Sequence, residues 1–245
     1  MSKKETTSNN LPTGQIATQA EADAFSLDTH IISLMFDEPF YSAVLRGVNF
    51  CRTESIPTAG VLAEDGEVNM WWNPRFLASL SKKQVKGLLK HESLHLAYEH
   101  TTSRRLDPHL IHNYATDLAI NSEIPEEELP SGGLIPGKAF DELSDSQMSN
   151  MLPQEIERYQ RLSNKIESLP KNKSTEWYFA KLIEDKQTKE DIQESQNYRG
   201  KSLSDALNDG DIKFDEDGNL VGKDGNEVTL VPGSVDDHDG WDEIS

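Results

Sequence analysis

Two neighbouring stretches of this chain carry apolar residues at the spacing of an amphipathic helix. In the first stretch, Ser81 followed by Gln84 has the form of a capping box, and no glycine or proline interrupts residues 90–101. The second stretch, residues 109–121, follows Asp107-Pro108, which we expect to supply the N-cap and the first helical residue. The pattern therefore predicts one continuous helix through residue 101 and a second helix after the proline.

Shorter patterns predict the elements around these two helices. Two β-prone runs flank Asp65-Gly66, and this dipeptide is typical of a hairpin turn. Residues 122–140 are rich in proline, glycine and glutamate, so we expect a loop that either covers a cleft or only connects elements. The other predicted elements are helices at 21–36, 40–48, 153–169 and from 174, a short helix or turn at 75–80, strands at 56–62 and 68–72, an exposed polar segment at 186–203, and a small β-ribbon within 212–231.

The first long helix contains a His-Glu-x-x-His motif formed by His91, Glu92 and His95. Residues four apart lie on the same face of a helix, so the two imidazoles can meet at one point, as two ligands of a tetrahedral zinc site would. Glu92 follows the first ligand directly and can act as the general base on a water at the metal. The spacing therefore predicts two ligands and a base.

A catalytic zinc site usually has three protein ligands, and the second helix offers the third. Asn113, Asp117 and Asn121 recur every four residues along one edge of this otherwise apolar segment. A carboxylate in such a segment is unfavourable unless it is paired, hydrogen-bonded or bound to a metal, so we predict Asp117 as the third ligand. The alternative is that Asp117 belongs to a buried hydrogen-bond network or orients a ligand histidine.

Three other histidines compete with Asp117 for this role. On a continuous helix, His100 lies half a turn away from His91, so it reaches the same metal only if the helix breaks near Tyr98, where there is no glycine. We therefore expect His100 to be a structural residue near the helix C-terminus, where a partial positive charge is favourable. His109 and His112 are weaker candidates.

Two further groups of residues have a structural and a functional interpretation. Arg104 and Arg105 follow the first helix, and we expect them to form salt bridges within the fold rather than to bind a substrate carboxylate. His238 lies in the segment Asp236-Asp237-His238 near the end of the sequence. It either stabilises an oxyanion or belongs to an acidic tail, and the tail is the interpretation we prefer.

These motifs together resemble a metallopeptidase domain family of bacteria and phages that often occurs beside a von Willebrand factor A-like domain. The similarity covers roughly residues 28–125 and continues weakly through 134–137, 176–178 and 236–238. It implies a zincin-like fold, a metal-dependent peptidase activity and a protein or peptide substrate. The residues that carry it are Asn73 and Pro74, then His91, Glu92, His95 and His100, and then Asn113, Ala115, Asp117, Ile120 and Asn121.

The resemblance and the patterns together predict an α+β fold, with the motif-bearing helix packed against further helices and a small β-hairpin or sheet. We expect a disordered N-terminal arm at 1–19, a zincin-like domain at 20–185 and an acidic C-terminal extension at 186–245. We expect no von Willebrand factor A-like module within these 245 residues, so such a partner would be supplied in trans.

Composition excludes several classes of function. The formal net charge is −19, and residues 205–245 carry 13 acidic side chains against two lysines. Nucleic acid and anionic membranes both require a basic surface, so neither is an expected partner. A single cysteine, the lack of a signal-peptide pattern and the lack of a long apolar stretch predict a cytoplasmic protein, in the host cytoplasm if a phage encodes it.

The predicted reaction is peptide hydrolysis, in which Zn²⁺ held by His91, His95 and Asp117 activates water and Glu92 is the general base. Two alternatives remain. One is a non-catalytic binding or assembly protein on a metallopeptidase-like scaffold. The other is a metal-dependent hydrolase of a non-peptide amide.

Overall fold

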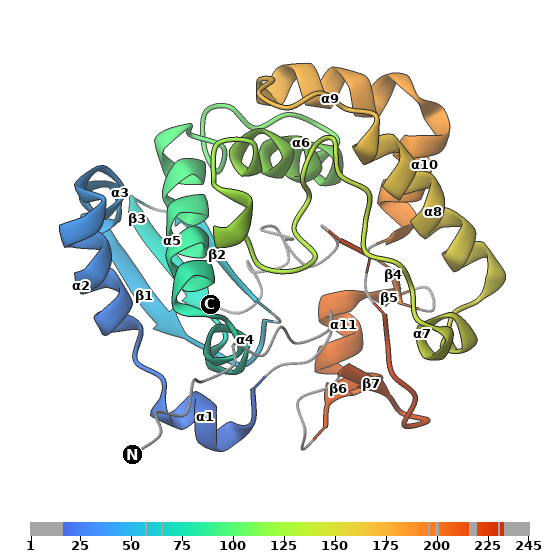
Figure 1. The fold of residues 1–245 in the computed structure, drawn as a ribbon, viewed down its shortest axis with the longest axis horizontal. Coiled ribbons are helices and arrows are strands. Elements are labelled where there is room, and N and C mark those ends of the chain that lie inside the picture. Colours follow the sequence, from blue (N-terminus) through green and yellow to red (C-terminus); the bar gives the residue numbers. More distant parts are fainter. Residues whose placement is uncertain are drawn as a thin grey trace, which may run out of the picture.

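The computed structural model describes residues 17–56, 58–64, 66–195, 197–198, 201–215, 220–229 and 231–232 of the 245-residue chain. The fold is a mixture of helices and small sheets (Figure 1), as the α+β prediction requires. Most of the predicted N-terminal arm and the acidic segment that contains His238 lie outside the described residues.

The N-terminal part of the fold is built on a three-stranded sheet of order β1-β3-β2. The predicted hairpin is present, since β2 (Ala59–Glu64) pairs antiparallel with β3 (Glu67–Trp72). The strand β1 (Val48–Arg52) pairs with β3 in parallel and occupies the other edge. Its presence corrects the prediction of a helix over 40–48, because α3 (Pro39–Val44) and the 3₁₀ turn η1 (Leu45–Gly47) end before it.

Helices pack on this sheet around a first core. The predicted single helix over 21–36 is in fact two, α1 (Gln19–Ala24) and α2 (Leu27–Asp37), with Phe25 in an extended conformation between them. The helix α4 (Pro74–Ser79) begins where the Asn73 side chain accepts the backbone N–H groups of Arg75 and Phe76. The buried members of the core are Leu27, Leu34, Leu45, Ala59, Val61, Met70, Trp72, Leu77, Val85, Leu88 and Leu89.

The helix α5 (Lys82–Ala97) connects this core to the rest of the molecule. It packs against α2, α3 and β2, and also against α6 (His109–Asn121) and the 3₁₀ turn η2 (Glu126–Glu128). The predicted capping box is confirmed, because Ser81 and Gln84 bond to each other's backbone N–H groups at its start. Its position between the sheet and α6 places the predicted histidines in the interior.

A second core lies beyond α6, on the side away from the sheet (Figure 1). It contains side chains of α6, α8 (Pro153–Glu167), α9 (Thr175–Glu184) and α10 (Lys186–Ser195), and α7 (Asp145–Asn150) precedes α8. The expectation of an exposed polar segment after residue 186 is wrong for α10. Its Thr188, Asp191, Ile192 and Ser195 are buried, because the helix packs against α6, α8 and α9.

The remaining described residues form small paired elements. Two short strands, β4 (Asn197–Tyr198) and β5 (Lys201–Ser202), pair antiparallel and precede α11 (Leu203–Asn208). The strands β6 (Ile212–Phe214) and β7 (Leu220–Gly222) also pair antiparallel, within the segment where the turn signals predicted a ribbon. Ala206, Ile212, Leu220 and Val228 form a small core there.

Candidate metal centre

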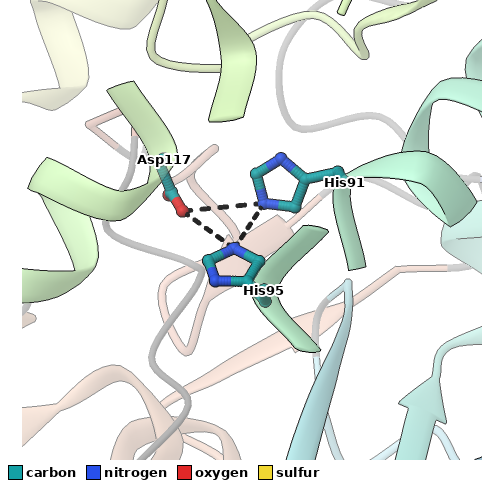
Figure 2. A group of neighbouring side chains, drawn as sticks. All are labelled: His91, His95 and Asp117. Carbon is teal, nitrogen blue, oxygen red and sulfur yellow. Dashed lines mark hydrogen bonds and ion pairs between the residues drawn. The ribbon is translucent and has the colours of Figure 1, made fainter. Parts of the chain in front are cut away.

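The three residues predicted as metal ligands meet where α5 and α6 cross. His91 and His95 are on α5, one turn apart, and Asp117 projects from α6 toward both (Figure 2). The Nε2 atoms of the two histidines are 2.9 Å apart, and Asp117 Oδ1 is 3.6 Å from His91 Nε2 and 3.3 Å from His95 Nε2. All three side chains are buried. Within the described part of the chain, this is the group whose ligand atoms converge as a metal site requires.

The spacing of these three atoms fits a zinc ion. Two ligands at tetrahedral positions about 2.0–2.1 Å from zinc are about 3.3 Å apart, which is close to the mean of the three observed separations. The three atoms lie on a circle of about 1.9 Å radius, so an ion slightly out of their plane is within bonding distance of all of them. Asp117 Oδ1 is also buried, and its contacts with the two histidine nitrogens, at 3.6 and 3.3 Å, are too poorly formed to compensate its charge as a bound cation would.

The protonation states of the cluster suit a metal as well. Burial lowers the pKa of His95 to about 3, so its imidazole is neutral at pH 7. Burial raises the pKa of Asp117, but the nearby His91 and His95 nitrogens lower it by more, so the carboxylate stays ionised. A neutral imidazole and an ionised carboxylate are the ligand forms that a metal binds.

Glu92 is completely buried and follows His91 on α5, in the interior of the fold. The sequence predicts a general base at this position, and the structure places its carboxylate on the helix that carries both histidines. A buried carboxylate is thus present on the same helix as both imidazoles, and its role as general base stays a prediction.

The helix that carries the histidines ends earlier than predicted. It stops at Ala97, and Glu99 adopts a left-handed backbone conformation with φ of 58°. Two backbone hydrogen bonds close the end, from Glu99 N to Leu96 O and from His100 N to His95 O, which is the pattern of a Schellman motif. The expectation of a continuous helix through residue 101 is therefore wrong, because a glutamate occupies the position that usually holds glycine.

This early end changes the surroundings of His100 without adding it to the cluster. Its ring turns back toward the site and lies 5.4 Å from the His95 ring between centroids, while its Nε2 lies 3.1 Å from Thr175 Oγ1. Burial lowers the pKa of His100 to about 3, so the ring is neutral and does not supply the positive charge expected at the helix end.

The other predicted candidates are occupied elsewhere. His112 donates from Nε2 to the backbone oxygen of His100, and His109 lies within hydrogen-bond distance of Arg105 and Asn113. These residues line a narrow cavity beside His95, together with Leu62 of β2. Arg104 forms an ion pair with Glu176 of α9, which agrees with its structural interpretation.

The start of α6 also differs slightly from the prediction. Pro108 is the N-cap residue and His109 is the first helical residue, so the cap lies one position later than expected. At the other end of α6, the side chain of Asn121 contacts both His91 and the backbone of residue Leu134. The sequence pattern includes Asn121 but gives no sign of this bridge.

Comparison with known protein families gives a match that covers both helices of the site. A family model described as "Putative metallopeptidase domain" matches residues 26–221. The chain belongs to this family. The match includes all of α5 and α6, and therefore every residue of the candidate metal centre.

Other comparisons give less information. A Thermotoga maritima protein described only as uncharacterized is 28% identical over 104 residues, which cover 41% of this chain and 26% of that protein. The chain thus aligns with about a quarter of the length of this relative. No solved structure matches the chain. Among the described residues, no helix is long and apolar enough to cross a bilayer.

Proposed function

We propose that this protein is a zinc-dependent peptidase with a zincin-like active site on α5 and α6. The observation that carries the proposal is the convergence of His91 Nε2, His95 Nε2 and Asp117 Oδ1 at zinc-ligand spacing. Membership in a family described as a metallopeptidase domain supports the same reaction class. A divalent metal would also compensate the buried charge of Asp117, whose contacts with the two histidine nitrogens are poorly formed hydrogen bonds.

In this proposal, His91, His95 and Asp117 hold the metal and Glu92 moves the proton. A zinc ion bound there would act as a Lewis acid on the scissile carbonyl and make water a stronger acid. Glu92 accepts a proton from the attacking water and later delivers it to the leaving amine. Its burial keeps bulk water away from the carboxylate, so the proton moves between the reacting groups.

We propose a protein or peptide as the substrate, bound in an extended conformation. β2 is the edge strand of the sheet on the side that contacts α5, and Leu62 of β2 lines the same small cavity as His95. An extended peptide that pairs with an edge strand is a common recognition mode. A von Willebrand factor A-like partner supplied in trans and a cytoplasmic location belong to the same proposal.

The decisive experiment combines metal analysis with a cleavage assay. Wild-type protein should contain one zinc ion per chain and should cleave a labelled unfolded protein. Glu92→Gln should keep the zinc but lose activity by at least about a hundredfold, which is the range for removal of a general base. Glu67→Gln, at an exposed position on β3, is the matched control and should behave like wild type.

Two results would overturn the proposal. One is a wild-type protein that binds no zinc even when zinc is supplied. The other is a zinc-loaded protein that cleaves neither the unfolded substrate nor itself.

A further inference from the structure

The side chain of Asn121 links the candidate metal centre to the loop that follows α6. Its Oδ1 lies 2.8 Å from His91 Nδ1, and its Nδ2 donates to the backbone oxygen of Leu134 at 2.9 Å. The carboxamide is buried, with 6% of the residue exposed. Each end of the Asn121 carboxamide therefore has one defined partner.

These two contacts determine which nitrogen of His91 carries the proton. A backbone carbonyl only accepts hydrogen bonds, so the amide end of Asn121 that faces Leu134 must be the NH₂ group. The end that faces His91 is then the oxygen, which also only accepts. His91 must donate to it from Nδ1. In the neutral ring the lone pair is consequently on Nε2, the atom that lies 3.6 Å from Asp117 Oδ1.

The Leu134 carbonyl that sets this orientation is itself held firmly. The Leu134 side chain is almost fully buried in the second core, and Ile135 is buried in a separate cluster with Leu94 and Ile120 of α5 and α6. Gly137 N also donates to the backbone oxygen of Ile166 on α8. The backbone between residues 134 and 137 is thus tied to both sides of the molecule, and it fixes the amide of Asn121.

We propose that Asn121 is a positioning residue that holds His91 in the Nδ1–H form and aims its Nε2 at the metal position. This inference rests on the proposed function only for its metal readout, because the proton position in the metal-free protein is a separate observable. Partners of this kind usually change metal affinity by about 10- to 100-fold when they are removed.

The test compares two substitutions at this position with a neighbour on the same helix end. Asn121→Leu removes both hydrogen bonds at similar size. Asn121→Asp keeps an oxygen acceptor for His91 but loses the donor to Leu134. Ser122→Ala is the control, because the Ser122 hydroxyl donates to Leu118 O and lies near Tyr178 Oη.

Zinc affinity is measured by competition with a chromophoric chelator, and the proton position of His91 by ¹⁵N NMR of the metal-free protein. We expect wild type and Ser122→Ala to show the Nδ1–H form and equal affinity. Asn121→Leu should lose that form and bind zinc about 10- to 100-fold more weakly, and Asn121→Asp should lose less affinity than Asn121→Leu.

The outcomes separate the two proposals. If Asn121→Leu binds zinc as tightly as wild type, Asn121 has only a structural role and the peptidase proposal stands. If metal-free wild type shows the Nδ1–H form but neither wild type nor any variant binds zinc, the inferred orientation of His91 is confirmed and the metal proposal fails. An Nε2–H form in metal-free wild type would overturn the present inference. Because the proton position of His91 is measured on wild-type protein, this experiment tests the inference even if Asn121→Leu does not fold.

Discussion

Gly87 provides a sharp test of how α5 is held. A Cβ atom at this position would lie 1.9 Å from the backbone oxygen of Glu128 and 2.6 Å from its carbonyl carbon. Both neighbours are backbone atoms of η2, so a side-chain rotation cannot relieve the overlap. The substitution Gly87→Ala must therefore push η2 and α5 apart, although alanine is normally the better helix former.

The size of the effect follows from two opposing contributions. Replacing glycine by alanine inside a helix stabilises it by about 0.8–1 kcal/mol. Overpacking a filled interior costs about 1–3 kcal/mol, and an overlap with rigid backbone belongs at the upper end of that range. Displacement of η2 also disturbs the ion pair between Glu128 and the buried Lys90, whose charged atoms are 2.7 Å apart. We therefore expect Gly87→Ala to lower the free energy of unfolding by about 2 kcal/mol.

Urea unfolding followed by tryptophan fluorescence measures this change, with Gly47→Ala as the matched control. A Cβ at Gly47 would meet nothing within 4 Å, so the control should be neutral or slightly stabilising. Since Gly87 lies one turn before His91, zinc affinity should fall together with stability in Gly87→Ala. A Gly87→Ala protein as stable as wild type would show that η2 does not pack against α5 in this way.

Three further predictions concern the site and the buried lysine on the same helix. Asp117→Asn should abolish stoichiometric zinc binding, whereas His100→Gln should retain it, and metal analysis of both purified proteins decides between the two candidate ligands. Lys90→Met should destabilise the protein by about 2 kcal/mol, because Glu38 and Glu128 lose the ammonium that lies 2.6 and 2.7 Å from them and are left with that of Lys86, at 3.2 and 3.4 Å. A change below about 0.5 kcal/mol in urea unfolding would contradict this. The pKa of His100 is near 6.5 in the unfolded chain and about 3 in the folded protein. Between these two values the unfolded chain binds one more proton than the folded protein. The free energy of unfolding therefore falls by about 1.4 kcal/mol for each unit by which the pH is lowered through this window. Unfolding curves of metal-free wild type and His100→Gln at pH 7, 6 and 5 should therefore converge toward low pH, and parallel pH dependences would refute the assignment.

Local signals in the sequence predicted the elements that position the site. The capping box at Ser81 is a sequence-local feature, since it depends on residues within three positions. The spacing of His91 and His95 places both rings on one helix face for the same reason. Asp117 could be singled out because an ionised side chain in an apolar helix needs a partner.

Other features depend on contacts that local patterns do not contain. Glu99 adopts a left-handed conformation at a position where glycine is usual, and the sequence has no glycine there to indicate a helix end. The end of α5 was therefore predicted too late. The parallel pairing of β1 with β3 joins strands that are separated by β2 in sequence. The bridge from Asn121 to Leu134 depends on a backbone carbonyl. Every residue has this group, so no sequence motif indicates which carbonyl Asn121 will contact.

The order of the donors along the chain has a consequence for biosynthesis. All three ligand atoms come from residues between 91 and 117, on two consecutive helices, while α8, α9 and α10 follow later. As the chain leaves the ribosome, the cluster can come together before the second core has been translated, because closing a short loop costs little entropy. Only the later arrival of Leu134 and its neighbours then locks His91 through Asn121. A nascent chain would thus pass through a stage in which its candidate metal ligands are present but His91 is not yet aligned, so tight metal binding would begin only after residue 134 has joined the fold.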